Sequence, residues 1–406
     1  MGAALWLAPG AFASGWCGAG EQSVDLPDIA TGQQIHAVYV IPSDGTDNFA
    51  SVANSMADTA DSIDAWWATQ DPTRNPRFDV AQFPSCTGLD ISFVRLPQSA
   101  EQLGDSADLV FQTIITTLTA ENLGNVYKRY LVFYDGPAPE PDICGVGGGD
   151  VSQGPGYAVV LLAGCPGIPV DTIAAHELLH ALGAVPAGDP HTCPNDSAHV
   201  CDNPLDVLYP YASGQPLTSL FLDWNHDDYY GQSGAWPDIQ DSPVLHLLQV
   251  PQVPVALTMT GGSGTVTTDL PGPACTASCT DNWDPVGSVT LFAQAGPNER
   301  FVGWQGACSG PSTCVLQLAG PKNVTAVFGP AAVPVRLSVT GRGRVVCSPG
   351  CSKVFPAGSP LHLVAVPAKG WRFVTWGGAC KGTRLTCSPA TNAAVSVHAT
   401  FKRKKR

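Results

Sequence analysis

Charged residues are scarce in this sequence, and positive charge is nearly missing from its first part. Only 13% of the 406 residues are Asp, Glu, Lys or Arg, about half the share of an average globular protein. Residues 1–250 hold 5 Lys and Arg against 30 Asp and Glu, a net charge of −25. Such a segment repels nucleic-acid phosphates, so we expect no nucleic-acid partner.

Long apolar runs are also missing. After residue 14 no run approaches the roughly 20 apolar residues of a membrane span, and we therefore expect no transmembrane segment. The 14 cysteines include no Cys-x-x-Cys pair, which disfavours zinc ribbons and thioredoxin-type motifs.

The cysteines that are there are even in number, and several form close local pairs. This pattern is typical of disulfides formed in an oxidising compartment. The apolar start leads to Ala11-Phe12-Ala13, a small-residue cleavage pattern, so residues 1–13 are predicted to be the end of a secretory signal peptide. We expect a secreted, extracellular protein, either free or attached to the cell surface.

Strands and helices alternate in residues 14–250, which predicts an α/β domain with a mostly parallel sheet. We expect strands at 36–42, 89–96, 130–134 and 157–162, and helices at 49–69, 107–123 and 171–182. Gly183 is the expected C-cap of the last helix. The glycine-rich run 145–149 lacks the Lys-Ser/Thr of a phosphate-binding loop and is interpreted as a flexible surface loop.

Residues 251–406 contain an internal duplication. Phe301, Trp304 and Cys308 recur 72 residues later, in a context rich in Val, Thr and turn residues. We predict two small all-β domains, 251–330 and 331–406, the second ending in a basic tail. The expected local disulfides are Cys275–Cys279, Cys308–Cys314, Cys347–Cys351 and Cys380–Cys387. On residues 301–308, 324–328 and their second copies, the units resemble the bacterial surface-protein repeats related to the B-repeat of internalins, which implies spacer or adhesive modules.

A candidate catalytic motif, His-Glu-Leu-Leu-His, occupies residues 176–180 within the helix predicted at 171–182. The i, i+4 spacing places His176 and His180 on one helix face, where both can bind one Zn²⁺. Glu177 can then act as the general base that deprotonates the metal-activated water.

With Gly183 the motif becomes HExxHxxG, which resembles the metzincin class of zinc endopeptidases and a group of secreted bacterial metzincin-like proteins. The resemblance implies a third zinc-binding His after the glycine and a Met-turn. Pro186 stands where the metzincin ligand would be, and Leu208 stands where the methionine would be in the segment 205–209.

We expect His191 to be the third zinc ligand, in a loop anchored by Pro186 and Pro190. The alternatives are His199, Asp189 and Asp202. A Cys193–Cys201 disulfide would hold His191 and His199 on fixed backbone beside the site.

Two further sets of residues are candidates for the site. The metzincin resemblance places Tyr209 near the metal as an oxyanion stabiliser, with core packing as the alternative. The segment 223–228 begins with the D-x-N-x-D pattern of a calcium loop, although solvated turn acids are the alternative. The candidate calcium ligands are Asp202, Asp206, Asp223, Asn225 and Asp227.

The sequence therefore predicts a metzincin-like α/β catalytic domain followed by two small all-β repeat domains. The predicted function is that of a secreted zinc metallopeptidase, a hydrolase of protein or peptide substrates. An extended substrate would add as a strand at the sheet edge near 157–162. The repeats would attach the enzyme to a surface, such as a cell-wall polymer, or act as spacers. The alternative is a non-catalytic secreted adhesin with a degenerate metallopeptidase fold, since Pro186 and the missing methionine leave the third ligand open.

Overall fold

The computed structural model describes residues 16–18, 20–150, 154–186, 188–210 and 214–404. The predicted signal peptide, 1–13, lies outside these residues. The chain divides into two compact units. The first extends to Val253 and includes Leu270–Pro273 and Asp281–Gly287, and the second comprises Pro254–Asp269, Ala274–Thr280 and Ser288–Arg406.

The first unit is built around a five-stranded sheet with the order β5-β1-β6-β8-β7. Neighbouring strands are parallel from β5 to β8, whereas β7 is antiparallel to β8 and forms an edge. The strands are β1 (Gln34–Ile41), β5 (Ile91–Arg95), β6 (Lys128–Tyr134), β7 (Gly145–Gly148) and β8 (Gly156–Leu161). The predicted parallel sheet is thus present, with one antiparallel strand added.

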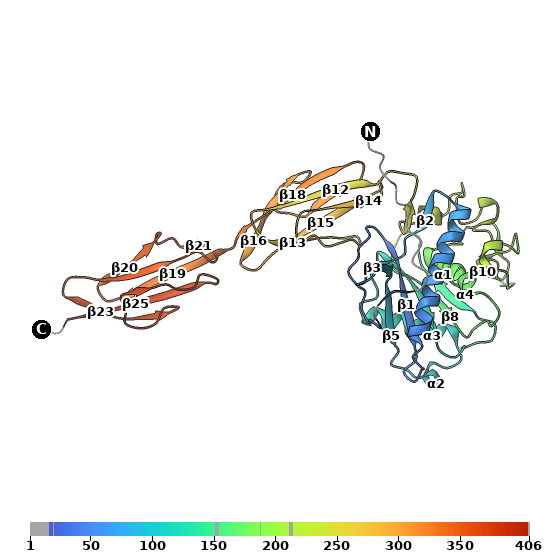
Figure 1. The fold of residues 1–406 in the computed structure, drawn as a ribbon, viewed down its shortest axis with the longest axis horizontal. Coiled ribbons are helices and arrows are strands. Elements are labelled where there is room, and N and C mark those ends of the chain that lie inside the picture. The colour runs from blue at the N-terminus through green and yellow to red at the C-terminus, as the bar shows by residue number, and fades with distance from the viewer. Residues whose placement is uncertain (1–15, 19, 151–153, 187, 211–213, 405–406) are drawn as a thin grey trace. The chain divides into compact units, whose positions relative to one another are not determined.

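Helices cover both faces of this sheet (Figure 1). The helices are α1 (Phe49–Gln70), α2 (Ala100–Leu103), α3 (Ala107–Ala120) and α4 (Val170–Leu182). β1 carries apolar residues on both faces because helices pack against each of them. Ile35 and Tyr39 point to the face covered by α1 and α4, and Val38 and Val40 point to the face covered by α2 and α3.

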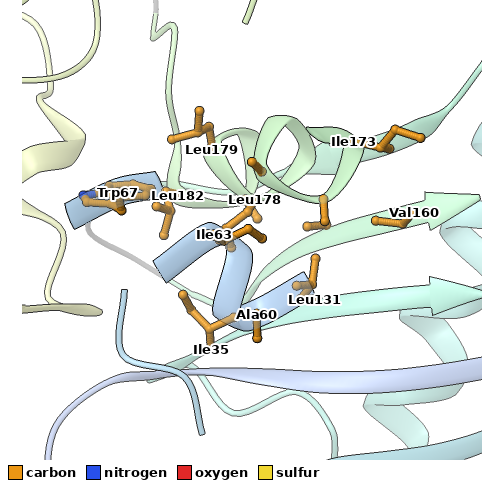
Figure 2. Packing of buried hydrophobic residues seen from close by; sticks show 14 of the residues in the cluster. Ile35, Ala60, Ile63, Trp67, Leu131, Val160, Ile173, Leu178, Leu179 and Leu182 are labelled. Carbon is orange, nitrogen blue, oxygen red and sulfur yellow. The ribbon is translucent and has the colours of Figure 1, made fainter. Parts of the chain in front are cut away.

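The core between α1, α4 and the sheet arises from apolar residues at helical spacing. Ala60 and Ile63 of α1 belong to one buried cluster with Leu178 of α4 and with Leu131 and Val160 of the sheet (Figure 2). This packing fixes α4, which carries the HExxH motif, against β7 and β8.

The rest of the first unit consists of short elements. They are β2 (Arg74–Pro76), β3 (Val80–Gln82), β4 (Thr87–Leu89), β9 (Thr192–Cys193), β10 (Asp196–Val200), β11 (Leu245–Leu247) and the 3-10 helices Leu217–Ser219, Trp224–His226 and Ile239–Asp241. Three disulfides hold this unit: Cys17–Cys86, Cys144–Cys165 and Cys193–Cys201.

The two repeats share one topology, a four-stranded sheet and a three-stranded sheet each. The sheet orders are β14-β12-β18-β16 and β13-β15-β17 in the first repeat, and β21-β19-β25-β23 and β20-β22-β24 in the second. The strands of the first repeat are β12 (Val253–Thr260), β13 (Gly264–Thr268), β14 (Cys279–Trp283), β15 (Ser288–Ala295), β16 (Glu299–Gly306), β17 (Cys314–Gln317) and β18 (Lys322–Pro330). Those of the second are β19 (Ala332–Thr340), β20 (Gly343–Ser348), β21 (Val354–Pro356), β22 (His362–Pro367), β23 (Trp371–Gly378), β24 (Thr386–Cys387) and β25 (Val395–Arg403).

Equivalent residues of the repeats make equivalent contacts. The indole N–H of Trp304 donates to the carbonyl of Ser312 at 2.8 Å, and that of Trp376 donates to the carbonyl of Arg384 at 2.8 Å. All four predicted local disulfides of the repeats are present. The duplication is therefore visible in the structure as well as in the sequence.

Among the described residues, no helix combines the length and the apolar character that crossing a membrane requires.

Candidate functional site

Helix α4 presents both histidines of the HExxH motif on one face. It ends where Gly183 adopts a left-handed conformation with φ of 88°, which a glycine tolerates without strain. The Nε2 atoms of His176 and His180 lie 3.3 Å apart.

A third imidazole, that of His199 in β10, completes a compact triad. Its Nε2 lies 3.1 Å from Nε2 of His176 and 3.4 Å from Nε2 of His180. Nitrogen ligands about 2.0–2.1 Å from a tetrahedral Zn²⁺ lie about 3.3 Å from one another. The three nitrogens therefore fit the ligand set of a zinc ion with a fourth position left for another ligand.

The Nδ1 atoms of His176 and His199 fix how these two imidazoles are oriented. Nδ1 of His176 lies 2.7 Å from the carbonyl oxygen of Val207, and Nδ1 of His199 lies 2.7 Å from Oδ2 of Asp196. Because these Nδ1 atoms donate, the Nε2 lone pairs point toward the centre of the triad, as metal ligation requires.

The imidazoles of α4 are also held neutral. Burial, reinforced by the neighbouring His199, lowers the pKa of His176 to about 4, and burial with both neighbouring imidazoles lowers the pKa of His180 well below its usual value. A neutral imidazole is the form that binds a metal ion.

His191, which we expected as the third ligand, does not join the triad. Its Nδ1 lies 2.7 Å from Oδ1 of Asp228. His199 takes this place because of the β9–β10 hairpin, which the Cys193–Cys201 disulfide closes. The second strand of the hairpin, β10, brings His199 to α4, whereas His191 lies before the first strand. The sequence contains one sign that favours His199 as a ligand: Asp196, three residues before it, can accept a hydrogen bond from its imidazole.

Glu177 lies beneath the edge strand β7 and is 5% exposed. Burial raises the pKa of its carboxyl to about 8. Two glycines of β7 leave room for it: a Cβ at Gly145 would lie 2.6 Å from Cγ of Glu177, and a Cβ at Gly147 would lie 2.5 Å from its carbonyl oxygen. Residues 145–148 are therefore a strand with a packing role, and their interpretation as a surface loop is wrong.

Two hollows flank the triad along β7. One, of about 470 Å³, is lined by Gly145, Glu177 and Tyr209 together with His176 and His199. The other, of about 430 Å³, is lined by His180 and the glycines 147–149. β7 therefore borders both hollows, and β8, where we expected the sheet edge for substrate, is covered by β7.

The segment compared with a Met-turn contacts the triad directly. Val207 accepts the hydrogen bond of His176, Leu208 is fully buried, and half-buried Tyr209 lines the larger hollow.

The candidate calcium ligands separate into two groups. The Asp206 carboxylate accepts hydrogen bonds from the amides of Leu208 and Trp224 and from the hydroxyl of Tyr229, each at 2.8 Å. Oδ2 of Asp223 accepts from the amides of residues 228–230 at 2.7–3.2 Å. Asp206 and Asp223 therefore stabilise the backbone of the loop at 223–230 through these hydrogen bonds.

The other calcium candidates lie elsewhere. Asp202 and Asp227 belong to a group with His191 and Asp228 whose ligand atoms lie within 4.8 Å of one another. Asn225, with a left-handed φ of 70°, is exposed and belongs to no such group among the described residues.

Comparison with known proteins identifies the C-terminal modules. Residues 255–332 and 333–405 match the divergent InlB B-repeat domain, which confirms the resemblance to internalin repeats. No curated protein matches the chain.

Some solved structures are similar to the chain at low scores. Wild-type OgpA from Akkermansia muciniphila is 10% identical with a TM-score of 0.31, covering 94% of this chain and 97% of that one. Catalytically inactive OgpA from the same organism, in complex with an O-glycopeptide substrate, is 10% identical with a TM-score of 0.30, covering 95% and 98%. The minor pilin GBS52 of Streptococcus agalactiae is 8% identical with a TM-score of 0.16, covering 38% and 97%. Scores this low carry no argument about fold or function.

Proposed function

We propose that the first unit is a zinc-dependent endopeptidase in which His176, His180 and His199 hold the metal and Glu177 is the general base. The observation that carries the proposal is the triad of Nε2 atoms, 3.1–3.4 Å apart. Three histidines plus one open position is the arrangement of catalytic rather than structural zinc sites.

The chemistry divides between the metal and Glu177. A zinc ion held in this way supplies a Lewis acid that acidifies water and polarises a carbonyl. Glu177 takes the proton of the attacking water and returns it to the amide nitrogen, which leaves as an amine. Burial beneath β7 keeps the Glu177 carboxyl in a fixed position next to the larger hollow.

The edge strand supports a polypeptide as the substrate. The free side of β7 offers backbone groups to which an extended peptide can add as a further strand, and both hollows beside the triad border this strand. Tyr209 lines the larger hollow, where its hydroxyl can stabilise the oxyanion of the tetrahedral intermediate.

We place this enzyme outside the cell. The chain has seven disulfides and no free cysteine among its described residues, as is typical of exported proteins. The two B-repeat domains, with a net charge of +11 over residues 251–406, serve as spacers or attach the enzyme to an anionic surface polymer.

Replacing the general base tests the proposal. In the purified full chain, Glu177→Gln should retain about one zinc per chain and lower the rate of peptide cleavage about 10²- to 10⁴-fold, the usual contribution of a general base. Glu121→Gln, an exposed glutamate at the end of α3, is the matched control and should cleave like the wild type.

Two results would contradict the proposal. Equal cleavage by Glu177→Gln and the wild type would remove Glu177 from the reaction. Zinc-loaded wild type that cleaves no member of a broad peptide library would favour the alternative, a non-catalytic binding protein.

A further inference from the structure

A second group of metal-type ligands lies outside the histidine triad. One ring nitrogen of His191 and one carboxylate oxygen each of Asp202, Asp227 and Asp228 lie within 4.8 Å of one another. His191 immediately precedes the β9–β10 hairpin and Asp202 follows it, whereas Asp227 and Asp228 lie in a separate loop. Exposed acids often cluster in this way by chance, so the group alone decides nothing.

The buried carboxylates of this region are the second observation. Asp228 is fully buried and Asp189 is 6% exposed, and no N–H or hydroxyl group of another residue donates a hydrogen bond to Oδ2 of either carboxyl group. The two carboxyl groups lie within hydrogen-bonding reach of each other. Burial, together with this neighbour, raises the pKa of Asp189 to about 7. Two buried carboxylates in contact are strongly unfavourable unless a positive charge or a proton lies between them.

Among the described residues, no lysine or arginine is paired with Asp189 or Asp228, and the basic group beside Asp228 is the imidazole of His191. The sequence contains no Lys or Arg between Arg129 and Arg300. By contrast, the buried carboxylate of Asp79 in the same unit forms an ion pair with a lysine, because Nζ of Lys128 lies 2.6 Å from its Oδ2. The imidazole of His191 contacts Oδ1 of Asp228, not its Oδ2.

We propose that His191, Asp202, Asp227 and Asp228 bind a divalent cation at a site separate from the histidine triad, with buried Asp189 next to Asp228. Three carboxylates and one imidazole suit a cation such as Ca²⁺ or Mn²⁺, with the carboxylates as the main ligands. The cation joins the loop at 189–191 to the loop at 227–228. It thereby stabilises the chain that leads into the hairpin carrying His199. This proposal does not depend on whether the triad is catalytic.

The test measures cation binding in the full chain. The protein is stripped with a chelator, loaded with one equivalent of zinc, and titrated with CaCl₂ or, separately, MnCl₂ while bound metal and melting temperature are recorded. We expect one further ion per chain in at least one titration, with a rise in melting temperature. Asp228→Asn should abolish this second ion, whereas Asp241→Asn, an exposed acid outside the group, should bind it like the wild type.

Further variants keep the test decisive if Asp228→Asn does not fold. Asp202 and Asp227 are exposed, so the double variant Asp202→Asn/Asp227→Asn should fold and bind the second ion at least tenfold more weakly. His199→Ala should still bind it, which separates this site from the triad.

The proposal is overturned if neither titration adds an ion, because the two carboxyls then share a proton instead. It is equally overturned if the double variant binds the second ion as tightly as the wild type, or if His199→Ala loses that ion.

Discussion

The identity of the third histidine can be decided by one pair of variants, His199→Ala and His191→Ala. The Nε2 atom of His199 is 3.1 and 3.4 Å from the other two ligand nitrogens, whereas Nδ1 of His191 is hydrogen-bonded to Asp228. Zinc sites of four protein ligands are worth on the order of 12 kcal/mol, about 3 kcal/mol for each ligand. Loss of one ligand therefore weakens zinc binding about 10²- to 10³-fold. We expect this loss in His199→Ala and a change of no more than about twofold in His191→Ala.

The measurement is competition for zinc between each variant and a chelating indicator of known affinity, at one pH and one ionic strength. Thermal unfolding of the zinc-free proteins serves as the control, because a variant that fails to fold reports nothing about the ligand. Retention of zinc by His199→Ala, combined with its loss in His191→Ala, would refute the assignment of the triad.

Three further predictions concern the surroundings of the site. In Asp196→Ala the imidazole of His199 loses its Nδ1 acceptor at 2.7 Å, so zinc affinity measured by the same competition should fall about 10- to 100-fold; unchanged affinity would contradict the orienting role of Asp196. In Gly147→Ala the new Cβ would lie 2.5 Å from a carbonyl oxygen of α4, and urea unfolding should show a loss of about 1–3 kcal/mol. Gly148→Ala, whose Cβ would have only one neighbour at 4.0 Å, should be nearly neutral, and equal losses in the two variants would exclude the steric explanation. Burial raises the pKa of Asp64 to about 6, so its contribution to stability is present below about pH 4 and is lost as the pH rises through 6. Asp64→Asn should accordingly gain stability relative to the wild type between pH 4 and pH 7, and a constant difference would argue against this titration.

The sequence was sufficient for features that depend on neighbouring residues. Apolar residues at helical spacing predicted the helix at 49–69, and the structure has it at Phe49–Gln70. The positions of His176 and His180 on one face follow from the i, i+4 spacing alone. The close cysteine pairs of the repeats were predicted for the same reason, whereas the pairing of Cys144 with Cys165, 21 residues apart, could not be derived from local spacing.

Features that depend on distant contacts were missed or misassigned. Which histidine reaches α4 is decided by the course of the chain between Ala184 and Val200, and proximity in sequence favoured His191 over His199. The glycine-rich run 145–149 looked like a loop because glycine is rare in strand interiors. Instead, the lack of a side chain at Gly145 and Gly147 leaves room for the close approach of Glu177, a constraint that no local pattern reveals.

The short hairpin between Cys193 and Cys201 makes the proposed metal site depend on when its disulfide forms. The disulfide removes freedom from a loop of about nine residues, worth about 2.5 kcal/mol in the chain-entropy description, and it closes the hairpin that brings His199 to α4. In a reducing environment this bond does not persist, and the hairpin that carries His199 loses this constraint. For the endopeptidase proposed above, forming this disulfide after export would be the step that completes the metal centre.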